Sequence, residues 1–454
     1  HDKIELKMGL EFGMQAHTIE KYEKLFYELK PEETHWGSWL HSPQIYFRGE
    51  QDIPGSTIHC GFQVIEQPVL LHEAPHFHCF DENVVFLGAT FPDVFSSFDA
   101  EIHFYMGPSL DRMEKIVITE PTIIKVPKNY WHGPLNFVRV DKPLYFQSVL
   151  FSGTADYVEL VERADGEQDY IFTSELNKKC VFNSEKRCTE CGGCFSKKDE
   201  LPKKPYKNVP WTVINEDGVQ RYTEKGAYDA SKAVSSLTAV VRPGYTTISY
   251  SDATTLLAKK PALLPETAKM VLAMPKEETK WGAWCPSPQA YFRGDIYMEN
   301  ANYNVGFQVF TASNDMEEPH FHQGVDEYIF FISADPTHPD DFDAEIEFYI
   351  GDDPDHMETK LITKPTVVRL PPTVWHCPIK FRKMNRPLIF QAAFMHGTWG
   401  TITRSEAAEG EQKSYFDRKY NYSYMGDNVR FCKFNDKKRC NICGACFPKP
   451  EIEE

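Results

Sequence analysis

The strongest constraint on this chain of 454 residues is that it contains one long pattern twice. Residues 61–64, Gly-Phe-Gln-Val, recur as residues 306–309, and residues 75–78, Pro-His-Phe-His, recur as residues 319–322. Further motifs recur in the same order and at a nearly constant offset. Such self-similarity is typical of a duplicated structural unit, so we expect two copies of one domain.

The sequence between the copies indicates where one domain ends. Residues 197–210 are rich in lysine and proline and suit a linker. We therefore expect a first domain over residues 1–205 and a second over residues 206–454.

Each half is predicted to be mostly β-structure. Runs of β-branched and aromatic residues are separated by Pro, Gly and Asp, as in a sandwich or closed barrel. These runs include residues 83–87, 116–118, 122–126 and 144–150. Helical spacing is found at residues 19–29 and 265–273, just before each predicted barrel.

Histidines and a glutamate recur in both halves with spacing suited to a metal site. His320 and His322 lie two positions apart, so on a strand both imidazoles would face one side. Glu327 follows after a short turn, and His376 begins a later apolar run. The first half has the same set, namely His76, His78, Glu82 and His132.

This donor set predicts a divalent transition metal in each half. Three imidazoles and one carboxylate suit Fe, Mn, Ni, Co or Zn, and an octahedral ion would keep open positions for substrate. An isolated His-x-His more often satisfies hydrogen bonds in a core, but here it is joined by a glutamate and a third histidine twice. In the first half Asp81 and Asn83 are rival ligand positions to Glu82. The spacing is clearer in the second half, which is therefore the better catalytic candidate.

Two nearby histidines, a glutamate and a later histidine after a proline-containing turn resemble the cupin signature. The resemblance covers roughly residues 36–155 and 281–400 and implies a bicupin. The predicted fold is thus all-β, with two tandem jelly-roll barrels, short helices and small cysteine-rich extensions. The glycine usual in the second cupin motif is absent from residues 127–132 and 372–376, which leaves the subfamily open. Cupins include dioxygenases, decarboxylases, isomerases, sugar binders and storage proteins, so the fold does not fix the function.

Most of the twelve cysteines form two clusters at residues 180–194 and 432–446. Four thiolates can hold a structural zinc ion or an iron–sulfur cluster, and three closely spaced cysteines favour the cluster. No secretory leader is visible, so we expect metal ligands instead of disulfides, in a cytoplasmic protein. The predicted ligands are Cys180, Cys188, Cys191, Cys194, Cys432, Cys440, Cys443 and Cys446.

Four other repeated polar residues are candidates for catalysis or substrate binding. Arg48 and Arg293 could clamp a substrate carboxylate, or form an ion pair with a local acid. Gln63 and Gln308 could bond to substrate inside the barrels, or close a barrel end.

Composition narrows the class of partner. A net charge of −17 disfavours nucleic acid, and no stretch is apolar enough to span a bilayer. A small-molecule substrate is therefore expected, and assembly into homo-oligomers stays open.

The combined prediction is a metal-dependent enzyme acting on a small carboxylated or hydroxylated metabolite, including aromatic ones. The expected chemistry is that of a Lewis-acid lyase, isomerase or hydrolase. A non-haem dioxygenase and a non-catalytic metal or metabolite sensor are the alternatives.

Overall fold

The computed structural model describes residues 21–34, 37–71, 75–109, 112–163, 168–173, 214–216, 219–221, 263–279, 281–322, 324–397, 400–406 and 420–426. Contacts divide the chain into two compact units. Pro31–Met274 forms one, which we call the first-barrel unit. His1–Lys30 and Pro275–Glu454 form the other, which we call the second-barrel unit.

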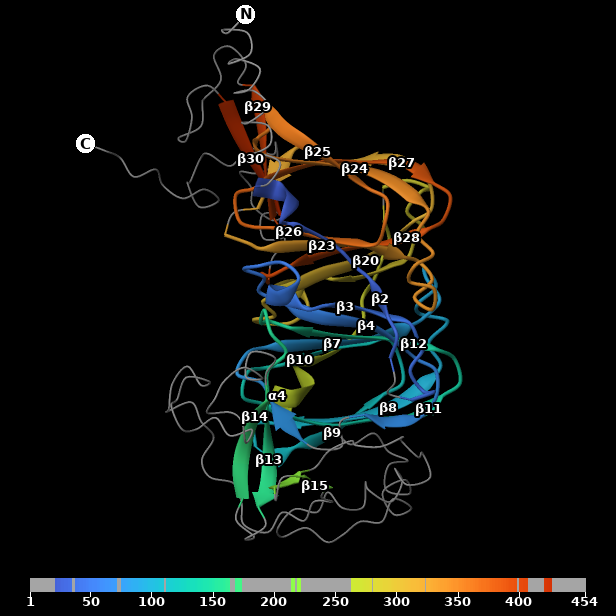
Figure 1. Cartoon of the computed structure of the whole chain (residues 1–454), viewed down its shortest axis with the longest axis vertical. Coiled ribbons are helices and arrows are strands. Elements are labelled where there is room, and N and C mark those ends of the chain that lie inside the picture. Colours follow the sequence, from blue (N-terminus) through green and yellow to red (C-terminus); the bar gives the residue numbers. More distant parts are fainter. Residues whose placement is uncertain are drawn as a thin grey trace, which may run out of the picture. The chain divides into compact units, whose positions relative to one another are not determined.

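The first-barrel unit contains two antiparallel sheets that lie as separate layers (Figure 1). One runs in the order β17 (Val271–Ala273), β10 (Thr122–Val126), β7 (Glu82–Gly88), β12 (Leu144–Leu150), β4 (His59–Ile65), β3 (Gln44–Phe47) and β2 (Pro31–Glu32). The other runs in the order β15 (Ile214–Glu216), β16 (Val219–Arg221), β13 (Tyr157–Arg163), β6 (His76–Phe77), β11 (Trp131–Val140), β8 (Ala100–Gly107) and β9 (Glu114–Ile118). In addition, β14 (Gln168–Thr173) pairs with β13, β5 (Val69–Leu71) pairs with β11, and the short helix η1 spans Gly49–Gln51.

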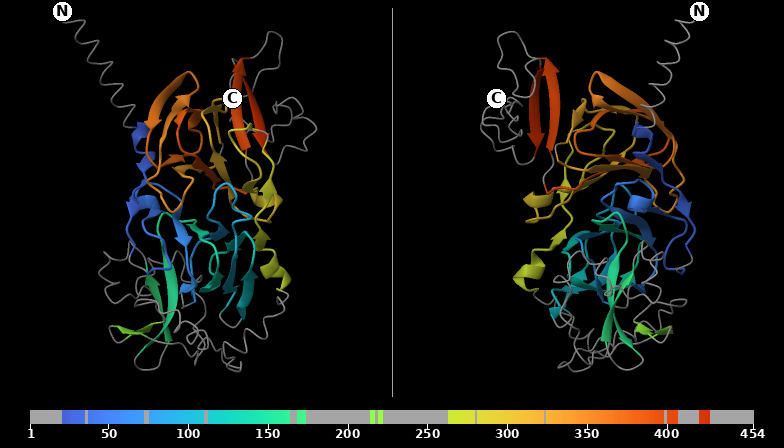
Figure 2. Two further views of the ribbon diagram at one scale, coloured as in Figure 1. Left: turned by 90° about the vertical axis from the view of Figure 1, so that its right-hand side faces the viewer. Right: turned by 60° about the vertical axis from the view of Figure 1, so that its left-hand side comes forward.

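The second-barrel unit repeats this arrangement. One sheet runs in the order β1 (Phe26–Glu28), β26 (Thr366–Leu370), β23 (Glu327–Ser333), β28 (Leu388–Phe394), β20 (Asn304–Phe310), β19 (Gln289–Phe292) and β18 (Lys276–Glu277). The other runs in the order β25 (His356–Ile362), β24 (Ala344–Asp353), β27 (Trp375–Met384), β22 (His320–Phe321), β29 (Gly400–Glu406) and β30 (Tyr420–Gly426), which forms a long ribbon with β29 (Figure 2). In addition, β21 (Asn314–Met316) pairs with β27, and the short helix η7 spans Gly294–Ile296.

A hydrophobic core fills the space between the two layers of each unit. In the first-barrel unit Phe137 of β11 lies against Phe86 of β7 and Phe146 of β12, with ring centroids 6.2 and 5.9 Å away. In the second-barrel unit Phe310 of β20 lies 5.0 Å from Phe381 of β27. Burying one such side chain contributes roughly 1.5–3 kcal/mol. The all-β, two-barrel fold class predicted from the sequence is therefore confirmed.

The predicted helices at residues 19–29 and 265–273 are only partly helical. Residues 21–23 are helical and α4 spans Pro265–Ala268, but the chain then extends into β1 and β17. Both β1 and β17 lie at the edge of a sheet that is formed mainly by the other half of the sequence. β1 pairs with β26, and β17 pairs with β10. The two halves of the sequence therefore exchange segments, and the division between the compact units falls at residues 30/31 and 274/275 rather than near residue 205.

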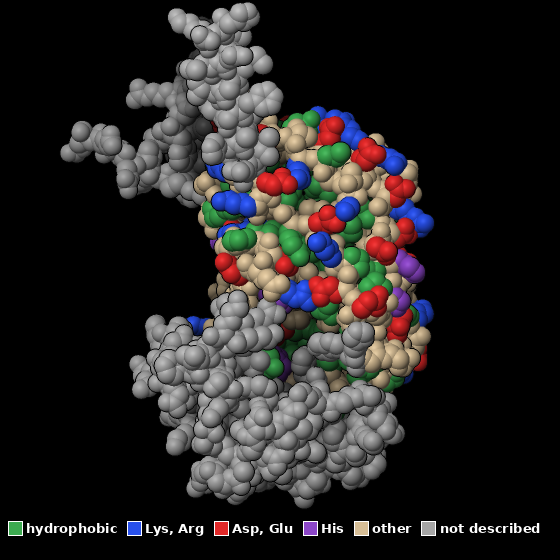
Figure 3. Space-filling view, viewed as in Figure 1, with side chains coloured by type: hydrophobic (Ala, Val, Ile, Leu, Met, Phe, Trp, Pro, Cys, Tyr) green, Lys and Arg blue, Asp and Glu red, His purple; other side chains and the backbone are tan. Residues whose placement is uncertain are grey.

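The face of the molecule seen in Figure 3 carries charges of both signs. Figure 3 shows Lys and Arg interspersed with Asp and Glu over the visible face. Among the described residues no helix has the length and apolar character needed to cross a membrane.

The N-terminal segment that leads into β1 packs in the second-barrel unit, so we expect it to stabilise that unit. Leu25 is buried in the core cluster of the second-barrel unit, so Leu25→Ala should lower the free energy of unfolding by about 2–5 kcal/mol. The control Lys24→Ala changes an exposed neighbour and should shift it by no more than about 0.5 kcal/mol. Urea denaturation measures both, and equal stability of the two variants would show that the N-terminal segment is not part of this core.

Candidate metal centres

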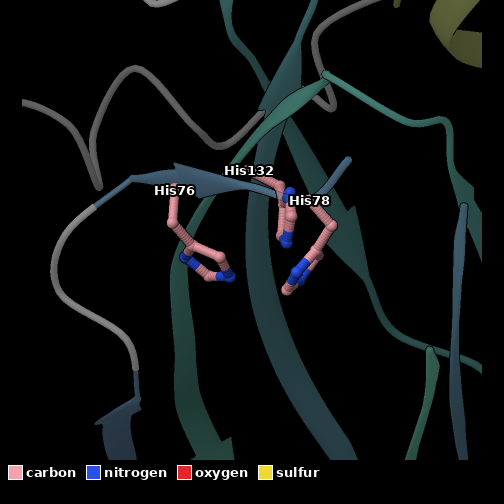
Figure 4. Close-up of side chains that lie close together, drawn as sticks. All are labelled: His76, His78 and His132. Carbon is pink, nitrogen blue, oxygen red and sulfur yellow. The ribbon is translucent and has the colours of Figure 1, made fainter. Parts of the chain in front are cut away.

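The histidines of each unit converge because of how two neighbouring strands are paired. His76 of β6 is the register partner of His132 of β11, and their ring centroids lie 4.2 Å apart. His78 follows two residues after His76, and its ring centroid lies 5.0 Å from that of His132. Figure 4 shows the three imidazoles extending to the same side of the strands. One coordinating atom from each residue can be chosen such that all lie within 4.8 Å of one another.

A glutamate from the opposite sheet completes this first-barrel centre. Glu82 opens β7, and its Oε2 lies 3.1 Å from His132 Nε2 and 3.5 Å from His78 Nε2. The Ser148 hydroxyl donates a 2.5 Å hydrogen bond to the other carboxylate oxygen, Oε1. This bond fixes the carboxylate so that Oε2 faces the histidines.

The second-barrel centre repeats the arrangement. His320 of β22 is the register partner of His376 of β27, with ring centroids 4.3 Å apart. Glu327 opens β23, and its Oε2 lies 3.0 Å from His322 Nε2 and 3.2 Å from His376 Nε2. All four side chains are almost completely buried.

Backbone carbonyl groups orient most of these imidazoles through Nδ1. His132 Nδ1 lies 3.0 Å from the Tyr130 oxygen, and His78 Nδ1 contacts the Asp156 oxygen. In the second-barrel unit the partners of His320, His322 and His376 are the oxygens of Glu318, Gly400 and Val374, at 2.8, 2.5 and 3.1 Å. Because a carbonyl oxygen only accepts, Nδ1 must carry the hydrogen, which leaves the Nε2 lone pair for a metal.

Several buried atoms of the two centres lie at ion-pair distance from one another but have no partner with hydrogen-bond geometry among the described residues. They are Glu82 Oε2, His132 Nε2, His322 Nε2, Glu327 Oε2 and His376 Nε2. Leaving a buried polar atom unpaired costs about 1–3 kcal/mol, so five such atoms at two matching places call for an explanation. The donor set of three imidazoles and one carboxylate fits a divalent transition-metal ion.

The electrostatics of the metal-free centres keep the glutamates ionised. Burial alone would raise the pKa of Glu82, but contacts with His132 and His78 outweigh it and hold the pKa well below the usual range. Burial would likewise raise the pKa of Glu327, but the contacts with His322 and His376 outweigh it and lower the pKa. Each centre therefore presents a negative charge to a cation.

The histidines differ in their protonation. Burial lowers the pKa of His132, and burial with the neighbouring His376 and His322 lowers the pKa of His320 well below 6.5. For His322 burial also opposes the charged form, but the Glu327 carboxylate outweighs it and raises the pKa. In the metal-free second-barrel centre His322 thus retains a proton more readily than His320 does.

Sequence reasoning missed one group beside the second-barrel centre, the Glu317 carboxylate. Glu317, His320 and Cys377 form another cluster whose possible ligand atoms lie within 4.8 Å of one another. The Glu317 side chain keeps 34% of its surface exposed, and desolvation of its carboxylate, together with the charge of Glu327, raises its pKa. The signal that could have found Glu317 is a repeated Glu-x-Pro-His, at residues 73–76 and 317–320.

The two arginines proposed for substrate binding have local carboxylate partners. Arg48 contacts both carboxylate oxygens of Glu32, with Nη2–Oε2 at 2.6 Å. Arg293 donates two hydrogen bonds of 2.6 Å to Glu277. Clamping a substrate would require breaking these bidentate pairs, so we assign the arginines to the ion pairs.

The two glutamines lie on matching strands, β4 and β20. Gln63 Nε2 donates a 3.2 Å hydrogen bond to the Tyr46 hydroxyl, and Gln308 is buried. The Gln63 contact is within the sheet, so a role toward substrate stays a prediction for both residues.

The eight clustered cysteines lie outside the described residues, so zinc or iron–sulfur binding there stays a prediction. Of the other four cysteines, Cys60, Cys285 and Cys377 are buried free thiols. Burial raises the pKa of Cys60 and Cys285 above that of an ordinary thiol, which disfavours the reactive thiolate.

No protein-family model and no curated protein matches the chain. Among solved structures, the chain is similar to oxalate decarboxylase from Bacillus subtilis. A deletion mutant of that enzyme has a TM-score of 0.43 at 11% identity, covering 82% of this chain and 75% of the other. A structure that describes the substrate binding mode of oxalate decarboxylase has a TM-score of 0.45 at 10% identity, covering 83% of this chain and 76% of the other. We therefore base the function on the geometry of this chain.

The raised pKa of His322 predicts how metal binding depends on pH. A metal ion must displace the His322 proton, so affinity at the second-barrel centre should fall by up to about tenfold per pH unit below the folded pKa. In the metal-free protein the protonated His322 stabilises the fold fully below pH 6.5, and this contribution is lost as the pH rises through its folded pKa. Calorimetric titrations between about pH 8 and pH 5.5 test this. Affinity that does not change with pH would contradict it.

Removing one ligand should empty one centre. His132→Ala and His376→Ala should each lower the bound Mn(II) by one equivalent per chain after chelation and reloading. Mn(II) is the suitable probe because the cysteine thiolates prefer softer ions. His356→Ala is the matched control, since its side chain is 81% exposed and should leave the metal content unchanged. Equal metal content in all three variants would show that the histidines do not bind the ion.

Proposed function

We propose that this chain is a metal-dependent enzyme of the cupin family with one metal centre in each barrel, acting on a small carboxylated or hydroxylated metabolite. The supporting observation is that each barrel brings three imidazoles and one carboxylate together. The atoms facing the common point include buried nitrogens and oxygens without hydrogen-bond partners among the described residues. An ordinary core histidine would have satisfied these atoms.

The residues of each centre have distinct roles in this proposal. The histidines bind through Nε2, and backbone carbonyls at Nδ1 keep the rings oriented. Glu82 and Glu327 add a negative charge, and Ser148 positions the Glu82 carboxylate. A divalent ion held there supplies Lewis acidity, which stabilises negative charge developing on a substrate oxygen.

The surroundings of the first-barrel centre favour a small substrate with an apolar part. Phe80 stacks on His78 with ring centroids 5.1 Å apart. The Tyr157 ring lies 5.7 Å from that of His76, which is only half-buried. Aromatic walls around a few polar ligands are typical of small-molecule sites. Because Arg48 is paired with Glu32, we assign recognition of a substrate carboxylate or hydroxyl to the metal centre.

The reaction class that we favour is Lewis-acid lyase, isomerase or hydrolase chemistry. Stabilising an enolate or alkoxide needs an open position on the ion but no change in its oxidation state. The four protein ligands of each centre leave such positions on an octahedral ion.

Turnover in the absence of oxygen tests this proposal. Mn(II)-loaded protein should convert a member of a panel of small hydroxy and keto acids under anaerobic conditions. The double variant His132→Ala/His376→Ala should lose this activity, whereas His338→Ala/His356→Ala, which changes two exposed histidines, should retain it. Turnover that requires oxygen would instead assign a dioxygenase, and binding without turnover would assign a sensor.

A further inference from the structure

A second carboxylate approaches the second-barrel centre from outside the predicted ligand set. Glu317 Oε2 lies 3.4 Å from His320 Nε2. This is the nitrogen left available when His320 Nδ1 bonds to the Glu318 oxygen. Glu317 therefore reaches the same side of the imidazole that a metal ion would occupy.

The backbone holds Glu317 in this position in a conformation that its side chain disfavours. Its φ of 58° lies in the left-handed region, which is uncommon for a residue with a long side chain. Glu317 directly follows β21, which is fixed by its pairing with β27. A disfavoured backbone conformation beside a candidate site is a pointer to function.

The neighbouring Cys377 shows the same feature. Its φ is 69°, and Gly133 occupies the matching position of the first-barrel unit with a φ of 87°. The second-barrel unit thus has side chains beside His320 at two positions where the backbone favours glycine. His320 is also almost fully buried, whereas its counterpart His76 is half-buried.

We propose that Glu317 is a fifth protein ligand of the second-barrel metal centre. The inference rests on the metal centre of the proposed function and adds a residue to it. A carboxylate oxygen is a hard donor that divalent ions such as Mn(II) accept readily. Together with Glu327 it balances the charge of a divalent ion, and it reduces the open positions of an octahedral ion from two to one.

The first-barrel unit has a glutamate at the same place in its sequence. Glu73 precedes His76 by the same number of residues as Glu317 precedes His320, but it lies outside the described residues. The inference is therefore made for the second-barrel centre alone, and its test must isolate that centre.

The test uses the full chain with His132→Ala as background, so that only the second-barrel centre binds Mn(II). Free Mn(II) measured by electron paramagnetic resonance gives the affinity. Adding Glu317→Gln should weaken binding by about tenfold or more. Adding Glu318→Gln should leave binding unchanged, because Glu318 has an exposed side chain and orients His320 through its backbone oxygen.

A second variant separates loss of a ligand from loss of folding. Glu317→Gly suits the positive φ, so the metal-free protein should melt at a higher temperature than the background. The rise in melting temperature on adding Mn(II) should be smaller than in the background.

The outcomes distinguish this inference from the proposed function. If Glu317→Gln and Glu318→Gln bind Mn(II) as tightly as the background does, Glu317 is not a ligand, and the four-ligand centre stands. If the His132→Ala background binds no Mn(II), both the inference and the second metal centre are overturned.

Discussion

The cross-strand pairing of two histidines is the constraint on which both centres depend. His76 faces His132, and His320 faces His376, each as register partners on neighbouring antiparallel strands. A shift of one residue would turn each imidazole to the opposite face of its sheet. The β-bulges that follow His132 and His376 in the pairing with the next strand show that the ladder is locally adapted around these residues. Register in the sheet is thus what positions the ligands.

The two centres share their ligands but differ in what supports them. Ser148 holds the Glu82 carboxylate in the first-barrel unit, whereas Ala392 occupies the matching strand position in the other. Gly133 is likewise matched by Cys377. The two units therefore share the histidine and glutamate ligand atoms and differ in the residues around them. Because the surroundings of a metal ligand tune affinity and reactivity, the two barrels are expected to hold their ions differently.

Much of the fold could be predicted because local pattern and final structure agree. The strands at residues 122–126 and 144–150 have the bounds that their β-branched and aromatic residues indicated. The histidine sets converge as the His-x-His spacing implied. The helical spacing at residues 265–273 was misleading, since Val271–Ala273 pairs with β10 and edge pairing overrode local preference.

Other features could not be read from the sequence because they depend on partners distant along the chain. The ion pair of Arg48 with Glu32 forms only when β3 and β2 lie side by side. The chain contains 66 Asp and Glu residues, and the sequence does not distinguish Glu317 from the others. Its distance to His320 does. The segment exchange through β1 and β17 was hidden for the same reason. The predicted cysteine sites lie outside the described residues and stay predictions.

Anomalous X-ray diffraction from crystals grown with Mn(II) tests the central claim most directly. The account predicts one anomalous peak per barrel, at coordination distance from the Nε2 and carboxylate oxygen atoms of its centre. A peak in neither barrel, or peaks only at surface carboxylates, would contradict the claim that these buried histidines and glutamates form metal centres.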